Sequence, residues 1–115
     1  MLQWFVVSIF LFVPLSFAQG DIGEREVILD NDSVQVVRLT YPVGTQSGMH
    51  KHKFPHRAVY FVKGGRLSLV ANDAAKSERI IEVADGQALF LPATTHNVKN
   101  IGQTEIVIIE TELKP

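Results

Sequence analysis

Three histidines have the residue type and spacing of a metal site. His50 and His52 are two residues apart, near the end of the segment Gly44–His52. Side chains on a β-strand alternate between its two faces, so both imidazoles would point to the same side. His96 follows Pro92 in a turn-like segment and could close the set from a neighbouring strand. Because neutral imidazole is a common transition-metal ligand, this set predicts a divalent-metal site.

Short strands separated by turns are expected to position these histidines. Residues 33–41 alternate apolar and polar side chains, and residues 58–62 form a dense apolar run before the tight turn at Gly64-Gly65. No segment after Gln19 has a helical period. The regular turn signals predict an all-β sandwich or barrel, of which the jelly roll is the natural small case. The remaining strands are expected at residues 66–70, 80–83, 88–91 and 105–113.

The N-terminus predicts a cleaved signal peptide over residues 1–18. An apolar run from Trp4 to Val13 is followed by the small-residue frame Ser16-Phe17-Ala18, which suits a signal peptidase. The run is shorter than the roughly 20 residues that span a bilayer, and an uncleaved anchor is the alternative. We therefore expect a periplasmic or secreted protein that has no membrane attachment after cleavage.

Length, charge and cysteine content limit the function classes. The chain has 115 residues, enough for one domain, and we expect an N-terminal lead-in at 19–33 followed by the domain at 34–113. A net charge of −1 without a basic block gives no support for nucleic-acid binding. The chain has no cysteine, so its stability must come from a hydrophobic core or from oligomerisation.

Two spaced motifs resemble those of the cupin family and together cover about Val34 to Glu112. The first motif combines a glycine, a His-x-His pair and a closing glycine, and the second combines Gly, Pro, His and Asn. The resemblance implies a jelly-roll, or cupin, β-barrel, a divalent transition metal (Fe, Mn, Ni, Zn or Cu) and a small-molecule ligand. The matching residues are Gly44, His50, His52, Gly64, Gly86, Pro92, His96 and Asn100.

The chain departs from the family where the first motif has a glutamate. Counted back from Gly64 the position holds Arg57, and counted forward from the histidine pair it holds His56. Neighbouring residues of a regular strand point to opposite faces, so only one of the two can face the barrel. The family register favours Arg57, since Tyr60 and Gly64 fix that end, whereas a bulge near Pro55 would select His56.

The two alternatives predict different sites. An inward His56 would give four imidazole ligands. An inward Arg57 would place a cation near the metal, weakening metal binding or clamping a substrate carboxylate. No carboxylate near the histidines is apparent from the spacing, so the second alternative predicts a strongly cationic pocket that attracts anions. Substituting Arg57 with glutamate would then restore the family motif, tighten metal binding and abolish anion binding.

Three functions remain open on the sequence alone. The protein is a metal-dependent enzyme acting on a small molecule, a non-catalytic module that binds a small molecule or a metal, or a structural dimer with a relic site. Strands 58–62 and 106–109 are apolar on both faces, as if both faces were covered. We therefore expect a homodimer.

Overall fold

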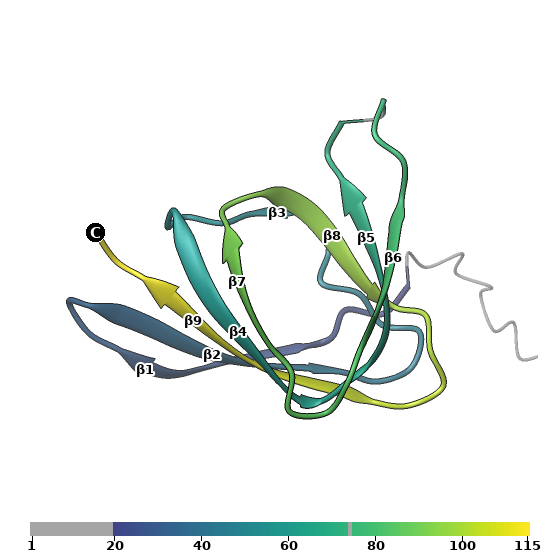
Figure 1. The fold of residues 1–115 in the computed structure, drawn as a ribbon, viewed down its shortest axis with the longest axis horizontal. Helices are drawn as coiled ribbons and strands as arrows, with labels where there is room; N and C mark the ends of the chain where they lie inside the picture. The colour runs from purple at the N-terminus through teal and green to yellow at the C-terminus, as the bar shows by residue number, and fades with distance from the viewer. Residues whose placement is uncertain (1–19, 74) are drawn as a thin grey trace, which may run out of the picture.

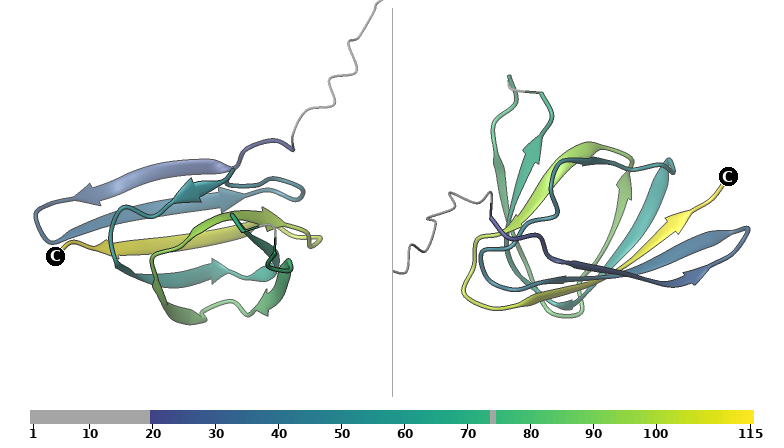
Figure 2. Two further views of the ribbon diagram at one scale, coloured as in Figure 1. Left: turned by 90° about the horizontal axis from the view of Figure 1, so that it is seen from above. Right: turned by 180° about the vertical axis from the view of Figure 1, so that it is seen from behind.

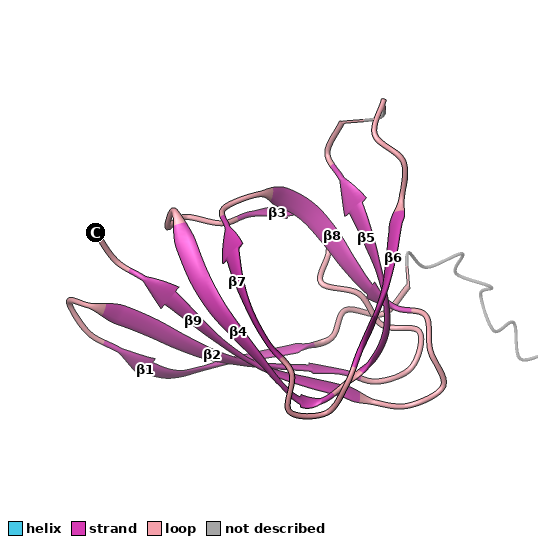
Figure 3. Cartoon of the chain, viewed as in Figure 1, coloured by secondary structure: helices cyan, strands magenta, loops and turns pink. Residues whose placement is uncertain are grey.

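The computed structural model describes residues 20–73 and 75–115, and the predicted signal peptide lies outside these residues. Within them the chain forms strands, turns and loops but no helix (Figure 3). No helix that could cross a membrane is found in this described part. The prediction of an all-β fold is confirmed.

In the described part of the chain, nine strands form two sheets that curve around one barrel (Figure 1). The five-stranded sheet has the order β1-β2-β9-β4-β7, and the four-stranded sheet has the order β3-β8-β5-β6. Every pairing between named strands is antiparallel, as in a jelly roll. The strands are β1 (Glu24–Asp30), β2 (Val34–Tyr41), β3 (His50–Lys51), β4 (His56–Lys63), β5 (Gly65–Ala71), β6 (Arg79–Val83), β7 (Ala88–Pro92), β8 (Thr95–Asn100) and β9 (Ile106–Leu113).

The core lies between the inner faces of the two sheets. Alternation along β4 buries Val59 and Phe61, and alternation along β9 buries Ile106 and Ile108. Leu67 on β5 covers them from the opposite sheet and is 2% exposed. Each such side chain contributes about 1.5–3 kcal/mol when it is fully buried, so this end of the barrel holds the two sheets together. The other end of the barrel interior is lined by polar side chains.

Two motif glycines are required by the backbone conformation and not by the chemistry of a site. A Cβ on Gly64 would lie 2.1 Å from the carbonyl oxygen of Val83, so the turn between β4 and β5 has no room for a side chain. Gly86 has φ +81°, in the left-handed region that favours glycine. Both residues set the close approach of β4 to the loop before β7, and neither faces the histidines.

Two segments differ from the strands expected from the sequence. The lead-in at residues 19–33 contains β1, which pairs with β2 from Glu24↔Thr40 to Asp30↔Gln35 and forms a hairpin extending past the other strands (Figure 2). The segment around His96 is a strand, β8, and not a turn. Both were missed because neither segment has a clean period-two pattern. Pairing with a neighbouring strand stabilises these segments.

Candidate metal centre

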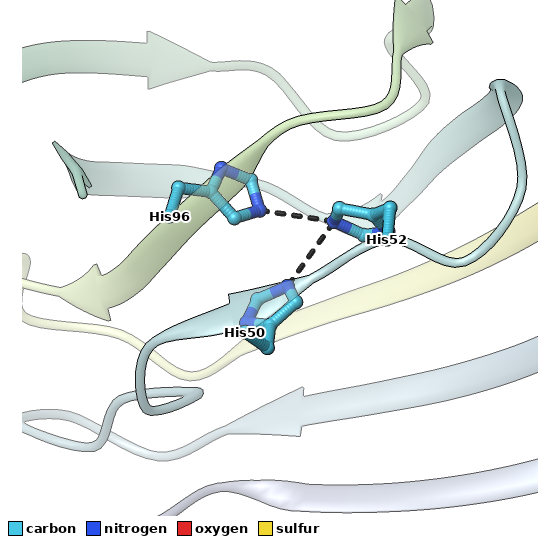
Figure 4. A group of neighbouring side chains, drawn as sticks. All are labelled: His50, His52 and His96. Atoms are coloured by element: carbon cyan, nitrogen blue, oxygen red, sulfur yellow. Dashed lines mark hydrogen bonds between the residues drawn. The ribbon is translucent and has the colours of Figure 1, made fainter. Parts of the chain in front are cut away.

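The three motif histidines come from two adjacent strands. His50 on β3 is the direct cross-strand partner of His96 on β8, and His52 follows just after β3 ends. The backbone N–H of His52 donates to the carbonyl of Thr94 at 3.2 Å, which keeps this residue beside β8. The period-two argument therefore holds for His50 and His52 even though β3 is only two residues long. The structure brings the three imidazoles together (Figure 4).

The imidazoles meet through their Nε2 atoms. Nε2 of His52 lies 3.1 Å from Nε2 of His50 and 3.1 Å from Nε2 of His96. The three ring centroids are 4.7–5.1 Å apart, with the rings edge to face. Metal–nitrogen bonds of about 2.1 Å at right angles would put two ligand nitrogens about 3.0 Å apart. The observed spacing fits three nitrogens around one ion.

The Nδ1 atoms of His50 and His52 each lie within hydrogen-bond distance of an acceptor oxygen. Nδ1 of His50 lies 2.9 Å from the carbonyl oxygen of Gly48, and Nδ1 of His52 lies 2.7 Å from Oε1 of Glu112. A carbonyl or carboxylate oxygen accepts, so each Nδ1 carries the proton and each Nε2 presents a lone pair. Two lone pairs at 3.1 Å repel each other unless a proton or a cation lies between them. The donor set therefore fits a metal cation.

Burial keeps His52 and His96 neutral, and neutral imidazole is the form that binds metal. Burial lowers the pKa of His96 to about 3, helped by the neighbouring His50, His52 and Arg57. Burial also lowers the pKa of His52, and the hydrogen bond that its Nδ1–H donates to Glu112, which raises this pKa, does not compensate. At neutral pH these two residues are ready to coordinate without first losing a proton.

The structure resolves which residue of β4 faces the barrel. Arg57 points inward and is 3% exposed, whereas His56 is exposed on the outer face and stacks on Phe90 with ring centroids 5.5 Å apart. No bulge interrupts β4 between Pro55 and Arg57, so the register favoured by the motif holds. His56 is not near the other three histidines, and the four-imidazole alternative is wrong for this reason.

The expectation of a strongly cationic pocket is also wrong. Two carboxylates of β9, Glu110 and Glu112, line the same wall as Arg57. Nε of Arg57 lies 3.5 Å from Oε2 of Glu110, and its Nη1 donates to the carbonyl of Pro92 at 2.9 Å. The guanidinium is therefore held by protein groups on two sides. The wall carries one positive and up to two negative charges.

Burial and like charge act on the pKa of Glu110 in opposition to Arg57. Burial raises the pKa of Glu110 to about 7, Arg57 lowers it and Glu112 raises it. Glu112 is 6% exposed, and its Oε2 is buried without a hydrogen-bond partner among the described residues, as is Nε of Arg57. The sequence did contain a signal for these carboxylates. Side chains alternate along a strand, so residues 110 and 112 face the same side as the apolar pair Ile106 and Ile108.

The histidines and this wall lie in one pocket of about 830 Å³. Its apolar floor includes Val59, Phe61 and Leu67. Five exposed cationic residues also line it, and none forms an ion pair with a described carboxylate. They come from β1, β3, the turn after it, and the β5–β6 hairpin: Arg25, Lys51, Lys53, Lys76 and Arg79.

Comparison with solved structures agrees with the two-sheet barrel. A cupin domain from Bordetella pertussis aligns with a TM-score of 0.77 and 26% identity, covering 85% of this chain and 99% of that one. A variant of oxalate decarboxylase from Bacillus subtilis aligns with a TM-score of 0.63 and 21% identity, covering 83% of this chain but only 26% of the larger one. No family model matches the sequence.

A curated relative decides the family. The beta-alanine degradation protein BauB of Pseudomonas aeruginosa is 32% identical over 89 residues, which is 76% of this chain and 90% of that protein. The chain belongs to the cupin superfamily. In this cupin the histidines of both motifs meet as the resemblance implied. The residue at the motif glutamate position is an arginine paired with a carboxylate from the neighbouring strand.

The depressed pKa of His96 predicts how the metal-free cupin responds to acid. Unfolded His96 titrates near 6.5 and folded His96 near 3, so the unfolded state binds more protons between these values and stability falls as pH falls. We expect the metal-free wild type to lose about 2 kcal/mol more than His96→Gln between pH 6.5 and about 4.5. Urea unfolding with a chelator present measures this difference.

Glu110 acts in the opposite direction in both proteins, so the comparison isolates His96. Because the pKa of Glu110 is raised, the folded state holds a proton that the unfolded state releases between about pH 4.5 and pH 7. That contribution to stability is lost as pH rises through 7. Parallel stability curves for wild type and His96→Gln would show that His96 is not held neutral by burial.

Proposed function

We propose that this cupin holds one divalent transition metal at His50, His52 and His96 and uses it to bind and transform a small carboxylate-bearing molecule. The observation that supports this most is the convergence of three Nε2 atoms. In His50 and His52 an acceptor oxygen holds the proton on Nδ1, so Nε2 presents a lone pair. A divalent ion bound there would supply a Lewis acid beside the pocket. Fe, Mn, Ni, Zn and Cu all accept imidazole ligands.

The pocket supports an anionic ligand. Unpaired lysines at its rim raise the local concentration of anions, and the carboxylates deeper inside limit how far a negative group can enter. The apolar floor excludes water from the inner part of the ligand. The relative from Pseudomonas is named for degradation of beta-alanine, which is a small carboxylate. Arg57 remains a candidate for contacting such a group, although Glu110 and Pro92 already hold it.

Titration calorimetry of the metal-loaded cupin tests this function. Beta-alanine and other small carboxylates are expected to bind, and amines of the same length without the carboxylate are not. The Lys51→Ala, Lys53→Ala double variant should bind carboxylates more weakly and keep its metal. Product detection by mass spectrometry then separates an enzyme from a non-catalytic binding module. Wild type that binds neither metal nor carboxylate would contradict the proposal and leave a structural protein with a relic site.

We also propose a homodimer formed through the outer face of the five-stranded sheet. The strand register aligns one row of almost entirely apolar residues across all five strands. Phe90 and Leu29, at the two ends of this row, are 64% and 49% exposed. A continuous apolar row on a two-sheet barrel is a self-complementary surface that suits a two-fold contact with a second copy. The row runs Leu29, Val36, Thr111, Ala58, Phe90.

Light scattering is expected to give twice the chain mass for wild type and the monomer mass for Phe90→Lys. Burying a lysine ammonium in an apolar contact is unfavourable, so this substitution opposes association. Val43→Lys is the matched control, because Val43 is 54% exposed in the turn after β2, off the strands that form this sheet. A wild type that stays monomeric at micromolar concentration, or a Val43→Lys variant that dissociates equally, would refute the outer face as the interface.

Export is proposed from the sequence. The frame ending at Ala18 predicts cleavage before Gln19. The intact mass of protein recovered from the envelope fraction is expected to lack residues 1–18. A mass that still contains Trp4 would refute cleavage.

A further inference from the structure

His52 uses both of its ring nitrogens. Nε2 faces His50 and His96, and Nδ1 lies 2.7 Å from Oε1 of Glu112. The side chain of Glu112 therefore lies behind His52 and not among the three Nε2 atoms. The side chain of His52 is 5% exposed and that of Glu112 is 7% exposed, so water does not compete for this hydrogen bond.

Glu112 is also the cross-strand partner of Arg57. The two residues stand opposite each other on β9 and β4, on the inner face of the sheet. The first cupin motif places a glutamate at position 57, where this chain has an arginine. The register brings a carboxylate to the same level of the barrel, one strand away. Arg57 itself is within ion-pair distance of the other carboxylate, Glu110, which lies 3.9 Å from Nδ1 of His52.

We propose that Glu112 is a positioning residue of the metal centre, replacing the motif glutamate by acting through His52 instead of as a direct ligand. It holds the His52 ring with Nδ1 protonated and Nε2 aimed at the metal, and its negative charge makes that imidazole a stronger donor. This inference rests on the proposed function for the metal itself. The orientation of His52 can be measured without any metal.

Three variants separate the carboxylate's charge from its role as an acceptor. Glu112→Gln keeps an acceptor oxygen and removes the charge, and Glu112→Leu removes both. Glu110→Gln is the matched control, because it replaces a carboxyl group with an amide on the same face of the same strand. Urea unfolding confirms that each variant is folded before it is measured.

Nitrogen-15 NMR of the metal-free protein reports the tautomer of His52. We expect the Nδ1–H tautomer in wild type, Glu112→Gln and Glu110→Gln, and a mixture in Glu112→Leu. Chelator competition with Zn²⁺ reports affinity. Loss of an outer hydrogen-bond partner typically weakens metal binding by about 10- to 100-fold, so we expect the low end for Glu112→Gln and the high end for Glu112→Leu.

Several results would overturn the role of Glu112. These are an Nε2–H tautomer in wild type, an unchanged Zn²⁺ affinity in Glu112→Leu, or an equal loss in Glu110→Gln. Two Zn²⁺ ions per chain would also overturn it, because His52, Glu110 and Glu112 would then form a second site. A wild type that binds no metal would refute the proposed function, and the tautomer in Glu112→Leu would still decide whether Glu112 orients His52.

Discussion

Replacing His50 and His52 together with alanine is expected to remove the bound metal completely. The double variant keeps only His96, and a single imidazole cannot hold a divalent ion against water. Metal analysis of tag-free protein purified without chelator should find about one ion per wild-type chain and none in the variant. Excess Zn²⁺ should stabilise wild type by about 2.7 kcal/mol at a hundred times its Kd and leave the variant unchanged.

His56→Ala is the control for this experiment. It removes an imidazole of the same type from the outer face of the same barrel, where the ring stacks on Phe90. Its metal content should equal that of wild type. Equal metal content in wild type and in the double variant would contradict the three-histidine centre.

Replacing Arg57 with glutamate is expected to destabilise the protein. On the sequence alone, this change restores the family motif. In the barrel it would instead bury a third carboxylate beside Glu110 and Glu112 and remove the guanidinium that pairs with Glu110. Breaking a buried ion pair by removing one partner costs about 3–5 kcal/mol. The midpoint of urea unfolding should fall accordingly, and metal binding should not tighten.

A second substitution tests whether charge is the cause. Adding Glu110→Gln to Arg57→Glu removes one of the three buried carboxylates, so it should recover part of the lost stability. Arg57→Met keeps much of the side-chain volume and should cost less than Arg57→Glu, because it introduces no new charge. If Arg57→Glu unfolds at the wild-type midpoint, Arg57 does not neutralise the pocket wall.

The sequence was sufficient to predict that the histidines share one site, because the spacing of His50 and His52 is a local property. Alternation along an extended chain places His50 and His52 on one face regardless of how long β3 is. The second motif then supplied His96, and the family register correctly selected Arg57 over His56 for the barrel interior. The turn glycines and the apolar run at residues 58–62 were equally local signals, so the all-β barrel could be predicted.

The pairing of the β9 carboxylates with Arg57 could not be predicted in the same way. Glu112 stands opposite Arg57 because β9 pairs with β4 in one register, and a slip of one residue would turn both β9 carboxylates outward. That register depends on the packing of Ile106 and Ile108 against the core, and these two residues are far from Arg57 in sequence. For the same reason β1 was missed, since its exposed residues gain a strand conformation only by pairing with β2.

Anomalous diffraction from a crystal grown with Zn²⁺ would test the three-histidine metal centre directly. We expect one strong anomalous peak per chain, about 2.1 Å from Nε2 of His50, His52 and His96. Glu112 should remain on the far side of His52, bonded to Nδ1. A peak between Glu110 and Glu112, or no peak near the histidines, would contradict it.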